Sequence, residues 1–373
     1  MKMNFDFYSG SDLYSDGEIE KEIISYIEKY GEENIEEVFK TDIRWPIFYH
    51  LTPIRRNIIN WYPFKDNADV LEIGAGMGAI TSTLCKKAKS VTAIELSKQR
   101  ATAIAKRNEN KENLEIIVAN LNDVEFTRKF DYITLIGVLE YASLYTKSNN
   151  PFNDFLNNIK KFLKPDGKLL IAIENQFGIK YFEGAVEDHT NIKYDGIVGY
   201  KNKNGVRTFG KIELKRILRD SGFMYQKFYY PLPDYKLPNI VFSDEYLPNE
   251  NTILEYTPYY YEGTELEFNE KEAYKEIIKN DMFDFFSNSF FVECSMQKID
   301  TSVDFSKVEF EKISDVSYKF YDKDYSKKMA NFEENKMLKE EIKNLNSKIN
   351  VITNSRSWKI TQPFRNINNK LKM

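Results

Sequence analysis

Apolar residues in the middle of the chain follow two alternating patterns. Short apolar runs of strand length occupy residues 68–74, 90–97, 114–121, 130–142 and 168–175. Between them lie segments whose apolar residues suit one face of a helix, at residues 79–88, 98–110 and 151–167. Apolar strands that alternate with amphipathic helices predict a parallel sheet that helices cover on both faces.

The chain on either side of this region is less regular. In the acidic first 40 residues, "EIEKEIISYIEKY" carries isoleucines at helical spacing and predicts a helix. Residues 176–205 are mixed in polarity and contain five glycines, so we expect a long loop or lid there. Two late strands are predicted at residues 224–231 and 289–298, and they could form an antiparallel edge on the parallel sheet.

These changes in pattern divide the chain into five parts. We expect an N-terminal helical segment that caps the cleft (1–66), a core (67–230), an aromatic-rich insertion that forms the substrate region (231–288), a last strand with its connection (289–324), and a tail (325–373).

The tail has a heptad pattern followed by a basic end. Leu338, Ile342, Leu345, Ile349 and Ile352 alternate steps of four and three, which predicts a coiled-coil seam of about two heptads. The seam could pair with a partner or with a second copy, so a homodimer is one expectation. The last 20 residues contain five basic and no acidic side chains, and could touch an anionic membrane surface.

The composition of the chain argues against a nucleic-acid-binding, disulfide-rich or membrane-spanning protein. The chain has 373 residues and a net charge of -4, so it offers no overall basic field for binding nucleic acid. Its two cysteines are too few for a disulfide framework and lack metal-ligand spacing. The N-terminus has no apolar segment of signal-peptide length, and no apolar run approaches the roughly 18 residues of a membrane span. We therefore expect a cytoplasmic protein with, at most, peripheral membrane contact.

The stretch "VLEIGAGMGAI" at residues 70–80 is the strongest candidate for chemistry. It runs from a predicted strand into three glycines, Gly74, Gly76 and Gly78, and then into a helix. Backbone without side chains can turn sharply there and approach a nucleotide closely. Glu95 ends the next strand, where a carboxylate can accept both hydroxyls of a ribose. A dinucleotide and S-adenosylmethionine both fit these features.

The spacing of the glycines separates the two ligands. A dinucleotide fingerprint is G-x-G-x-x-G, whereas the third glycine here comes one residue early. Glu72 lies two residues before Gly74, where an acid would oppose a pyrophosphate. S-adenosyl-L-methionine carries a sulfonium and an ammonium, which an acid tolerates. The sequence therefore predicts S-adenosyl-L-methionine as the cofactor.

With "ANLNDV", "FDYITLIGVLEYA" and "LKPDGKLLIAIEN", residues 45–230 resemble class I S-adenosylmethionine-dependent methyltransferases. The resemblance implies an α/β, Rossmann-like, mostly parallel sheet. The patterns described above add an antiparallel edge strand, N-terminal helices, an aromatic-rich insertion and a helical or coiled-coil tail to this expected fold. Arg55 could bind the methionine carboxylate or form a helix-surface salt bridge. The predicted cofactor-binding residues are Glu72, Gly74, Gly76, Gly78, Glu95, Leu96, Asn120, Leu121, Gly137, Val138 and Arg55.

Other segments, including "IAIENQFGIKYFEGAVEDHT" and "SRSWKITQPFR", resemble a bacterial methyltransferase group that accompanies glycosyltransferases in surface-glycan biosynthesis. This resemblance implies O-methylation of a sugar, as a glycan, nucleotide sugar or lipid-linked sugar, at the inner face of the membrane. It also implies a glycosyltransferase partner that the tail contacts. The alternatives are a small-metabolite or protein acceptor, or a methyltransferase-like scaffold for glycosyltransferases.

A sugar hydroxyl is a poor nucleophile, so a general base would help the transfer. The chain has two histidines. We predict His189, in the lid, as the base, with Asp188 or Glu174 orienting or replacing it; the alternative is an ordinary loop histidine. His50 more plausibly packs or caps the cleft. No metal site is expected, because neither histidine has metal-ligand spacing.

Overall fold

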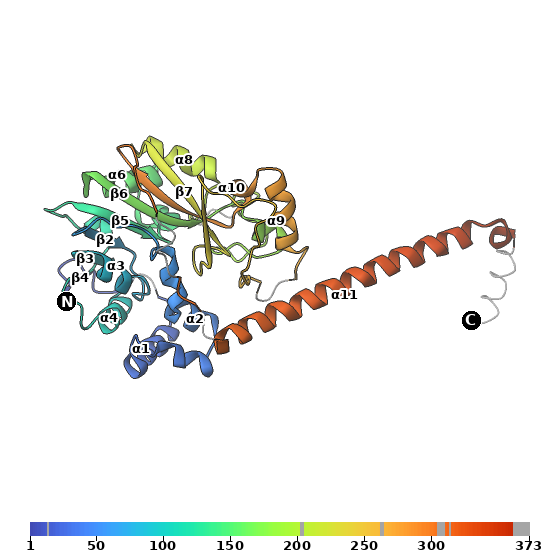
Figure 1. The fold of residues 1–373 in the computed structure, drawn as a ribbon, viewed down its shortest axis with the longest axis horizontal. Coiled ribbons are helices and arrows are strands. Elements are labelled where there is room, and N and C mark those ends of the chain that lie inside the picture. Colours follow the sequence, from blue (N-terminus) through green and yellow to red (C-terminus); the bar gives the residue numbers. More distant parts are fainter. Residues whose placement is uncertain (13–14, 202–204, 262–264, 304–309, 313–314, 361–373) are drawn as a thin grey trace.

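The structure is a computed structural model that describes residues 1–12, 15–201, 205–261, 265–303, 310–312 and 315–360. Nine strands in this part of the chain form one sheet, in the order β1-β4-β3-β2-β5-β6-β9-β7-β8 (Figure 1). The strands are β1 (Lys2–Asn4), β2 (Asp69–Ile73), β3 (Ser90–Glu95), β4 (Leu114–Val118), β5 (Phe130–Ile136), β6 (Leu163–Glu174), β7 (Tyr225–Leu232), β8 (Ile240–Ser243) and β9 (Ser289–Ser295).

The strands from β1 to β6 are mutually parallel, as the alternation of apolar runs and helices predicts. Neighbouring residues of β2 lie in different cores, because Val70 packs on one face of the sheet and Leu71 on the other. The helices α3 (Thr81–Lys87) and α4 (Lys98–Arg107) cover the first face. The helices α6 (Pro151–Lys160) and α8 (Lys211–Asp220) cover the second. Burial on both faces explains why these strands are continuous apolar runs.

The late strands extend the sheet in an order that their sequences do not reveal. β9 is antiparallel, but it lies between β6 and β7 and not at the edge. β8 is the antiparallel edge strand. The insertion at 231–288 is therefore a connection within one sheet. The three-residue β1, which pairs with β4, was not predicted because it is too short to carry a periodic pattern.

The N-terminal segment folds as α1 (Ile19–Tyr30), η1 (Ile35–Lys40), α2 (Trp45–Leu51) and η2 (Pro53–Ile58). Apolar side chains from these helices form a core of their own with Met77 of the glycine loop and Ala103 of α4. The segment thereby lies against the end of the sheet where β2 and β3 finish. His50 is buried here, with Nε2 3.8 Å from Asp16, and burial lowers its pKa.

The predicted lid, residues 176–205, is mostly packed and contains α7 (Ile179–Glu183). The insertion adds α9 (Glu270–Lys279) and α10 (Phe283–Phe286), and α5 (Ala142–Tyr145) follows η4 (Leu139–Tyr141) after β5. In the tyrosine-rich stretch 256–261, Tyr256, Tyr260 and Tyr261 donate hydrogen bonds to the buried carboxylate of Glu270. These tyrosines hold the insertion together instead of facing a ligand.

The described part of the tail consists mainly of the helix α11 (Asp315–Asn354), which projects away from the body (Figure 1). Near its base, Met329 and Phe332 pack against a small core that includes Tyr181 and Tyr261. The outer seam residues are about half exposed, so the predicted helix is present while pairing of the seam stays a prediction. Residues 361–373, most of the basic end, lie outside the described chain. Among the described helices, none is both long enough and apolar enough to span a bilayer.

Candidate active site

A cavity of about 630 Å³ lies at the carboxyl ends of β2, β3, β4 and β5. In an open α/β sheet, this end is where ligands bind. The N-terminal segment closes one side of the cavity and the 188–189 and 235–236 loops close another. Ten of the predicted cofactor residues line it: Arg55, Glu72, Gly74, Gly76, Glu95, Leu96, Asn120, Leu121, Gly137 and Val138.

The glycine loop has the backbone geometry that its sequence predicts. Gly74 and Gly76 have φ angles of +70° and +57°, which side chains disfavour. A Cβ on Gly74 would lie 2.5 Å from Cγ2 of Val138, whereas a Cβ on Gly76 would meet no atom within 4 Å. Gly76 therefore leaves open the space that a ligand needs. Gly78 does not line the cavity; a Cβ there would approach Cα of Ile104 in α4 to 3.1 Å, so it permits close helix packing.

The Glu95 carboxylate is fixed at the end of β3. Its Oε2 accepts the N–H of Gly76 at 2.7 Å and its Oε1 accepts the N–H of Ser97 at 2.9 Å. Burial raises its pKa. A carboxylate has about four acceptor positions, so these bonds leave two for the hydroxyls of a ribose. One hydrogen bond thus joins the glycine loop to Glu95, the residue that the sequence predicts to bind a ribose.

Glu72 lies at the floor of the cavity, only 4% exposed, and its Oε2 accepts a hydrogen bond from Thr81 at 2.7 Å. Burial, with the nearby charge of Glu95, raises the pKa of Glu72 to about 8. An acid with so high a pKa ionises readily only when a cation comes close. The cavity therefore favours a positively charged ligand, as the spacing of the loop predicts.

This raised pKa makes cofactor affinity depend on pH. Because the ionised form of Glu72 attracts a cation, we expect the dissociation constant of S-adenosylmethionine to fall about tenfold as the pH rises from near 6.5 to near 8.5. A Glu72→Gln variant keeps an oxygen that accepts the hydrogen bond of Thr81, but its amide does not ionise. Its affinity for S-adenosylmethionine should therefore lack this pH dependence. Calorimetric titrations of both proteins across this range are the test, and equal pH dependence in the two would contradict it.

Arg55 approaches the cavity from η2 and is buried. Its Nη1 donates to the carbonyl of Lys236 at 3.1 Å, and its guanidinium lies 4.2 Å from the centre of the Tyr49 ring. Its Nε has no hydrogen-bond partner among the described residues. A buried guanidinium with a free donor suits a carboxylate ligand better than a surface salt bridge.

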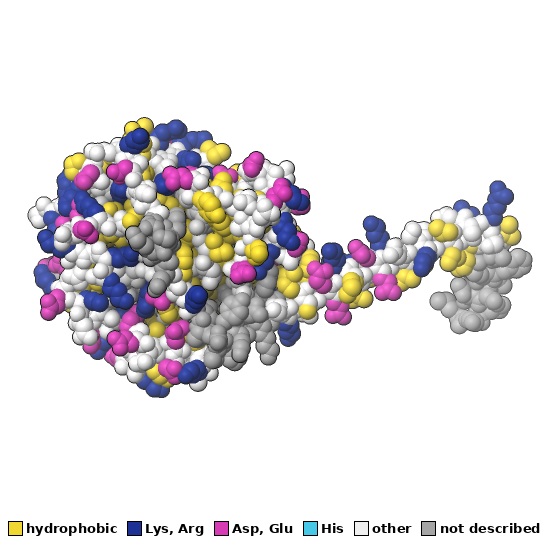
Figure 2. Space-filling model, in the orientation of Figure 1, with side chains coloured by type: hydrophobic (Ala, Val, Ile, Leu, Met, Phe, Trp, Pro, Cys, Tyr) yellow, Lys and Arg dark blue, Asp and Glu magenta, His cyan; other side chains and the backbone are white. Residues whose placement is uncertain are grey.

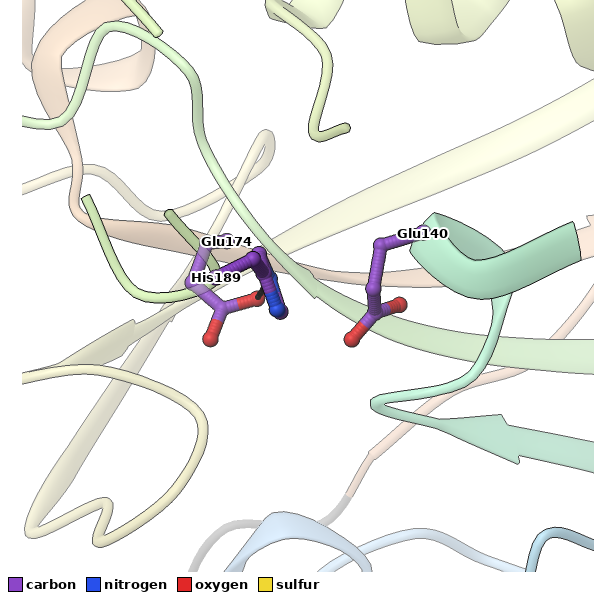
Figure 3. A group of neighbouring side chains, drawn as sticks. All are labelled: Glu140, Glu174 and His189. Carbon is purple, nitrogen blue, oxygen red and sulfur yellow. Dashed lines mark ion pairs between the residues drawn. The ribbon is translucent and has the colours of Figure 1, made fainter. Parts of the chain in front are cut away.

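A cluster of Glu140, Glu174 and His189 borders the cavity (Figure 3). Glu140 comes from η4 after β5, Glu174 ends β6, and His189 lies in the loop after α7. Figure 3 shows the Glu140 carboxylate facing the other two side chains. Nε2 of His189 lies 3.6 Å from Oε2 of Glu174, and Nδ1 lies 3.1 Å from the hydroxyl of Tyr141.

The carboxylates behind His189 are held by two buried lysines. Lys236 contacts Oε1 of Glu174 at 2.6 Å and also pairs with Asp188. Lys180 contacts Oδ2 of Asp188 at 2.9 Å, and the hydroxyl of Tyr181 donates to the same oxygen at 2.5 Å. Asp188 lines the cavity, but both of its oxygens are engaged; Glu174 lies behind His189 and outside the lining. These contacts suit positioning better than proton transfer.

The three residues of the cluster have different pKa values. Burial opposes ionisation of Glu174, but the Lys236 ammonium lowers its pKa to about 2. Burial and the charge of Glu174 raise the pKa of Glu140 to about 8. Burial disfavours the charged form of His189, yet the hydrogen bond and charge of Glu174 raise its pKa to about 9. At neutral pH, His189 therefore holds a proton, and Glu140 has the pKa nearest to the working range of a general base.

The same three side chains bring ligand atoms within 4.8 Å of one another, so they could hold a metal ion. The sequence predicts no metal, because neither histidine has metal-ligand spacing. The ammonium of Lys236, 2.6 Å from Glu174, already supplies positive charge to the cluster. We therefore interpret the cluster as a proton-handling site.

Sequence reasoning placed Glu140 in the segment 137–141 that lines the cleft but gave it no catalytic role, and it missed Lys236. Glu140 falls within the motif "GVLEYA", and its position one turn after a glycine at the end of β5 was the available signal. Its Oε2 is buried and has no hydrogen-bond partner among the described residues. Lys236 follows β7 and gives no local signal, because its partners Glu174 and Asp188 are about 50 residues or more away in the sequence.

Comparison with known proteins agrees with this geometry. Residues 71–169 match the family model described as a methyltransferase domain. The ubiquinone biosynthesis O-methyltransferase of Rickettsia bellii is 25% identical over 151 residues, which cover 39% of this chain and 60% of that protein. The ribosomal RNA small subunit methyltransferase A of Wigglesworthia glossinidia brevipalpis is 37% identical over 92 residues, which cover 24% of this chain and 35% of that protein.

Among solved structures, phosphoethanolamine N-methyltransferase 1 of Haemonchus contortus, in complex with phosphoethanolamine and S-adenosylhomocysteine, aligns with a TM-score of 0.41 at 14% identity. The alignment covers 80% of this chain and 51% of that one. The chain spans 60% of the Rickettsia relative's length. The predicted Rossmann-like, mostly parallel sheet is confirmed by the strand order, and the family match and the curated relatives support a class I methyltransferase with S-adenosylmethionine as its cofactor. Neither curated relative is named for a sugar acceptor.

Proposed function

We propose that this protein transfers a methyl group from S-adenosylmethionine to a hydroxyl of a sugar. The observation that best supports the cofactor is the cradle at Gly76, where open space beside a bare backbone adjoins the Glu95 carboxylate. Arg55 offers a donor for a carboxylate at the same cavity. Glu72 at the floor becomes negatively charged when a cation comes close, so it fits a cation and opposes a diphosphate.

S-adenosylmethionine supplies a methyl group that its sulfonium already activates, so the protein mainly provides alignment and a place for one proton. In the transfer, the acceptor oxygen bonds to the methyl carbon as the carbon–sulfur bond breaks, and that electron pair stays on sulfur. The hydroxyl proton passes to a base. Glu140 lines the cavity, and its Oε2 has no hydrogen-bond partner in the part of the chain that the structure describes, so we assign it this role.

His189 then positions the acceptor instead of acting as the first base. Its imidazolium lies beside Glu174 and Tyr141, and its charge favours the ionised form of Glu140. Lys236 stabilises this arrangement through ion pairs with Glu174 and Asp188. The predicted catalytic set of His189, Asp188 and Glu174 thus acts as the support for Glu140.

The aromatic wall of the cavity supports a sugar as the acceptor. The aromatic residues that line the cavity are Trp45, Tyr49, Tyr141, Tyr145, Phe155 and Tyr235. Aromatic faces suit the apolar C–H faces of a sugar ring, while Glu140 is placed to accept from a hydroxyl. We propose a nucleotide-linked or lipid-linked sugar of a bacterial surface glycan, methylated where glycosyltransferases build it, in the cytoplasm at the inner membrane face. A small metabolite or a protein is the alternative acceptor.

Transfer of a labelled methyl group into separated fractions of a bacterial extract tests the acceptor. The full chain, incubated with labelled S-adenosylmethionine, is expected to label the nucleotide-sugar or lipid-linked sugar fraction. The Glu140→Gln variant, added in equal amount, controls for other methyltransferases in the extract. Label that appears only in protein or in small metabolites lacking a sugar would refute the sugar acceptor while leaving the methyl transfer intact.

A further inference from the structure

The outer part of α11 carries an apolar stripe that faces solvent. Leu338, Ile342, Leu345, Ile349 and Ile352 are between 49% and 57% exposed. Figure 2 shows hydrophobic side chains along the projecting helix, among charged ones of both signs. An isolated helix is only marginally stable from helix propensity alone. Helices in proteins gain most of their stability by burying one apolar face against a partner.

We propose that α11 pairs with α11 of a second copy of this chain, as a parallel, in-register, two-stranded coiled coil. Steps of three and four along the stripe place Ile342 and Ile349 at a positions, and Leu338, Leu345 and Ile352 at d positions. β-branched residues at a with leucine at d favour two strands over three or four. Four of the five stripe residues follow this pattern, and Ile352 at the last d position is the exception.

One heptad before Ile342, the a position is occupied by Asn335, which is exposed. A single asparagine at an a position fixes register and oligomeric state at some cost in stability, because it is satisfied only opposite another asparagine. In a parallel pair in register, Asn335 meets Asn335 of the second copy. An antiparallel pair would place it against an apolar side chain.

The charges that flank the stripe select the same orientation. Glu334 occupies the g position before Asn335, and Lys339 occupies the next e position. In a parallel coiled coil, a g side chain faces the e side chain of the following heptad on the other helix. Glu334 of each copy therefore meets Lys339 of the other, which gives two opposite-charge contacts per dimer. The two bodies then lie at the same end of the coiled coil.

Sedimentation equilibrium of the full chain over a wide range of concentration tests the pairing. We expect a concentration-dependent dimer that Ile342→Lys reduces to a monomer. Val351→Lys is the matched control, because Val351 is 71% exposed on the same helix but occupies a c position off the stripe. A monomer at every concentration, a trimer, or an equal loss of pairing in the Val351 variant would overturn the proposal.

Oxidative cross-linking tests the orientation. Leu338→Cys and Ile352→Cys are each expected to link efficiently to the same residue of the second copy. The native Cys85 and Cys294 are buried, so they do not compete. Cross-links that form only when the two variants are mixed would mean antiparallel helices and would refute the proposed register. These readouts use no activity, so they stand apart from the proposed methyl transfer.

Discussion

Gly76→Val is expected to abolish binding of S-adenosylhomocysteine, with at least a hundredfold rise in the dissociation constant, or about 2.7 kcal/mol. The Cβ at this position would project into open space with no atom within 4 Å, so the valine would occupy the space of the ligand. The φ of +57° adds strain to the loop. Titration calorimetry of the purified full chain measures the effect.

Gly31→Val separates loss of space from backbone strain. Gly31 ends α1 with a φ of +64°, and its Cβ would also meet no atom within 4 Å. It is exposed and does not line the cavity. We expect this variant to lose a similar amount of stability but to keep its affinity for S-adenosylhomocysteine. Equal affinity in the Gly76 and Gly31 variants would contradict the placement of the cofactor.

Glu140→Gln is expected to lower kcat by about 10²–10⁴-fold while affinity for S-adenosylhomocysteine stays close to that of the wild type. The amide keeps the shape of the side chain but cannot take a proton. In the wild type, kcat should rise with pH until it levels off above about 8, because the ionised carboxylate is the active form and burial raises the pKa of Glu140 to about 8. The variant should lack this rise.

His189→Gln distinguishes a positioning role from a direct one. The charge of His189 lowers the pKa of Glu140, so its removal should move the rise of kcat to higher pH without eliminating it. Initial rates measured across pH with both variants give the answer. A kcat that is unaffected in Glu140→Gln, together with a lost pH dependence in His189→Gln, would return the role of base to His189.

The cofactor half of the site is predictable because its signals are local. Gly74, Gly76 and Glu72 lie within a few residues of one another, and Glu95 follows at a fixed distance along a βαβ unit. Chemistry and spacing alone therefore select the ligand. Gly78 is the exception, since its contact with Ile104 on another element decides that it serves packing.

The part of the cavity that we propose for the acceptor depends on long-range pairing, which the sequence does not reveal. Glu140, Glu174 and His189 come from three elements that only the sheet brings together. The roles within the cluster follow from Lys236, whose charge holds Glu174 ionised and leaves Glu140 as the carboxyl with a raised pKa. The interior position of β9 could not be predicted for the same reason, because the sequence of one strand does not reveal its place in the order of the sheet.

A crystal structure of the full chain with S-adenosylhomocysteine tests the central claim most directly. The account predicts that the ligand fills the cavity, with its backbone contacts at Gly74 and Gly76, its ribose hydroxyls on Glu95 and its sulfur directed toward Glu140. A ligand bound elsewhere, or one whose ribose lies away from Glu95 while its sulfur faces the opposite wall, would contradict it.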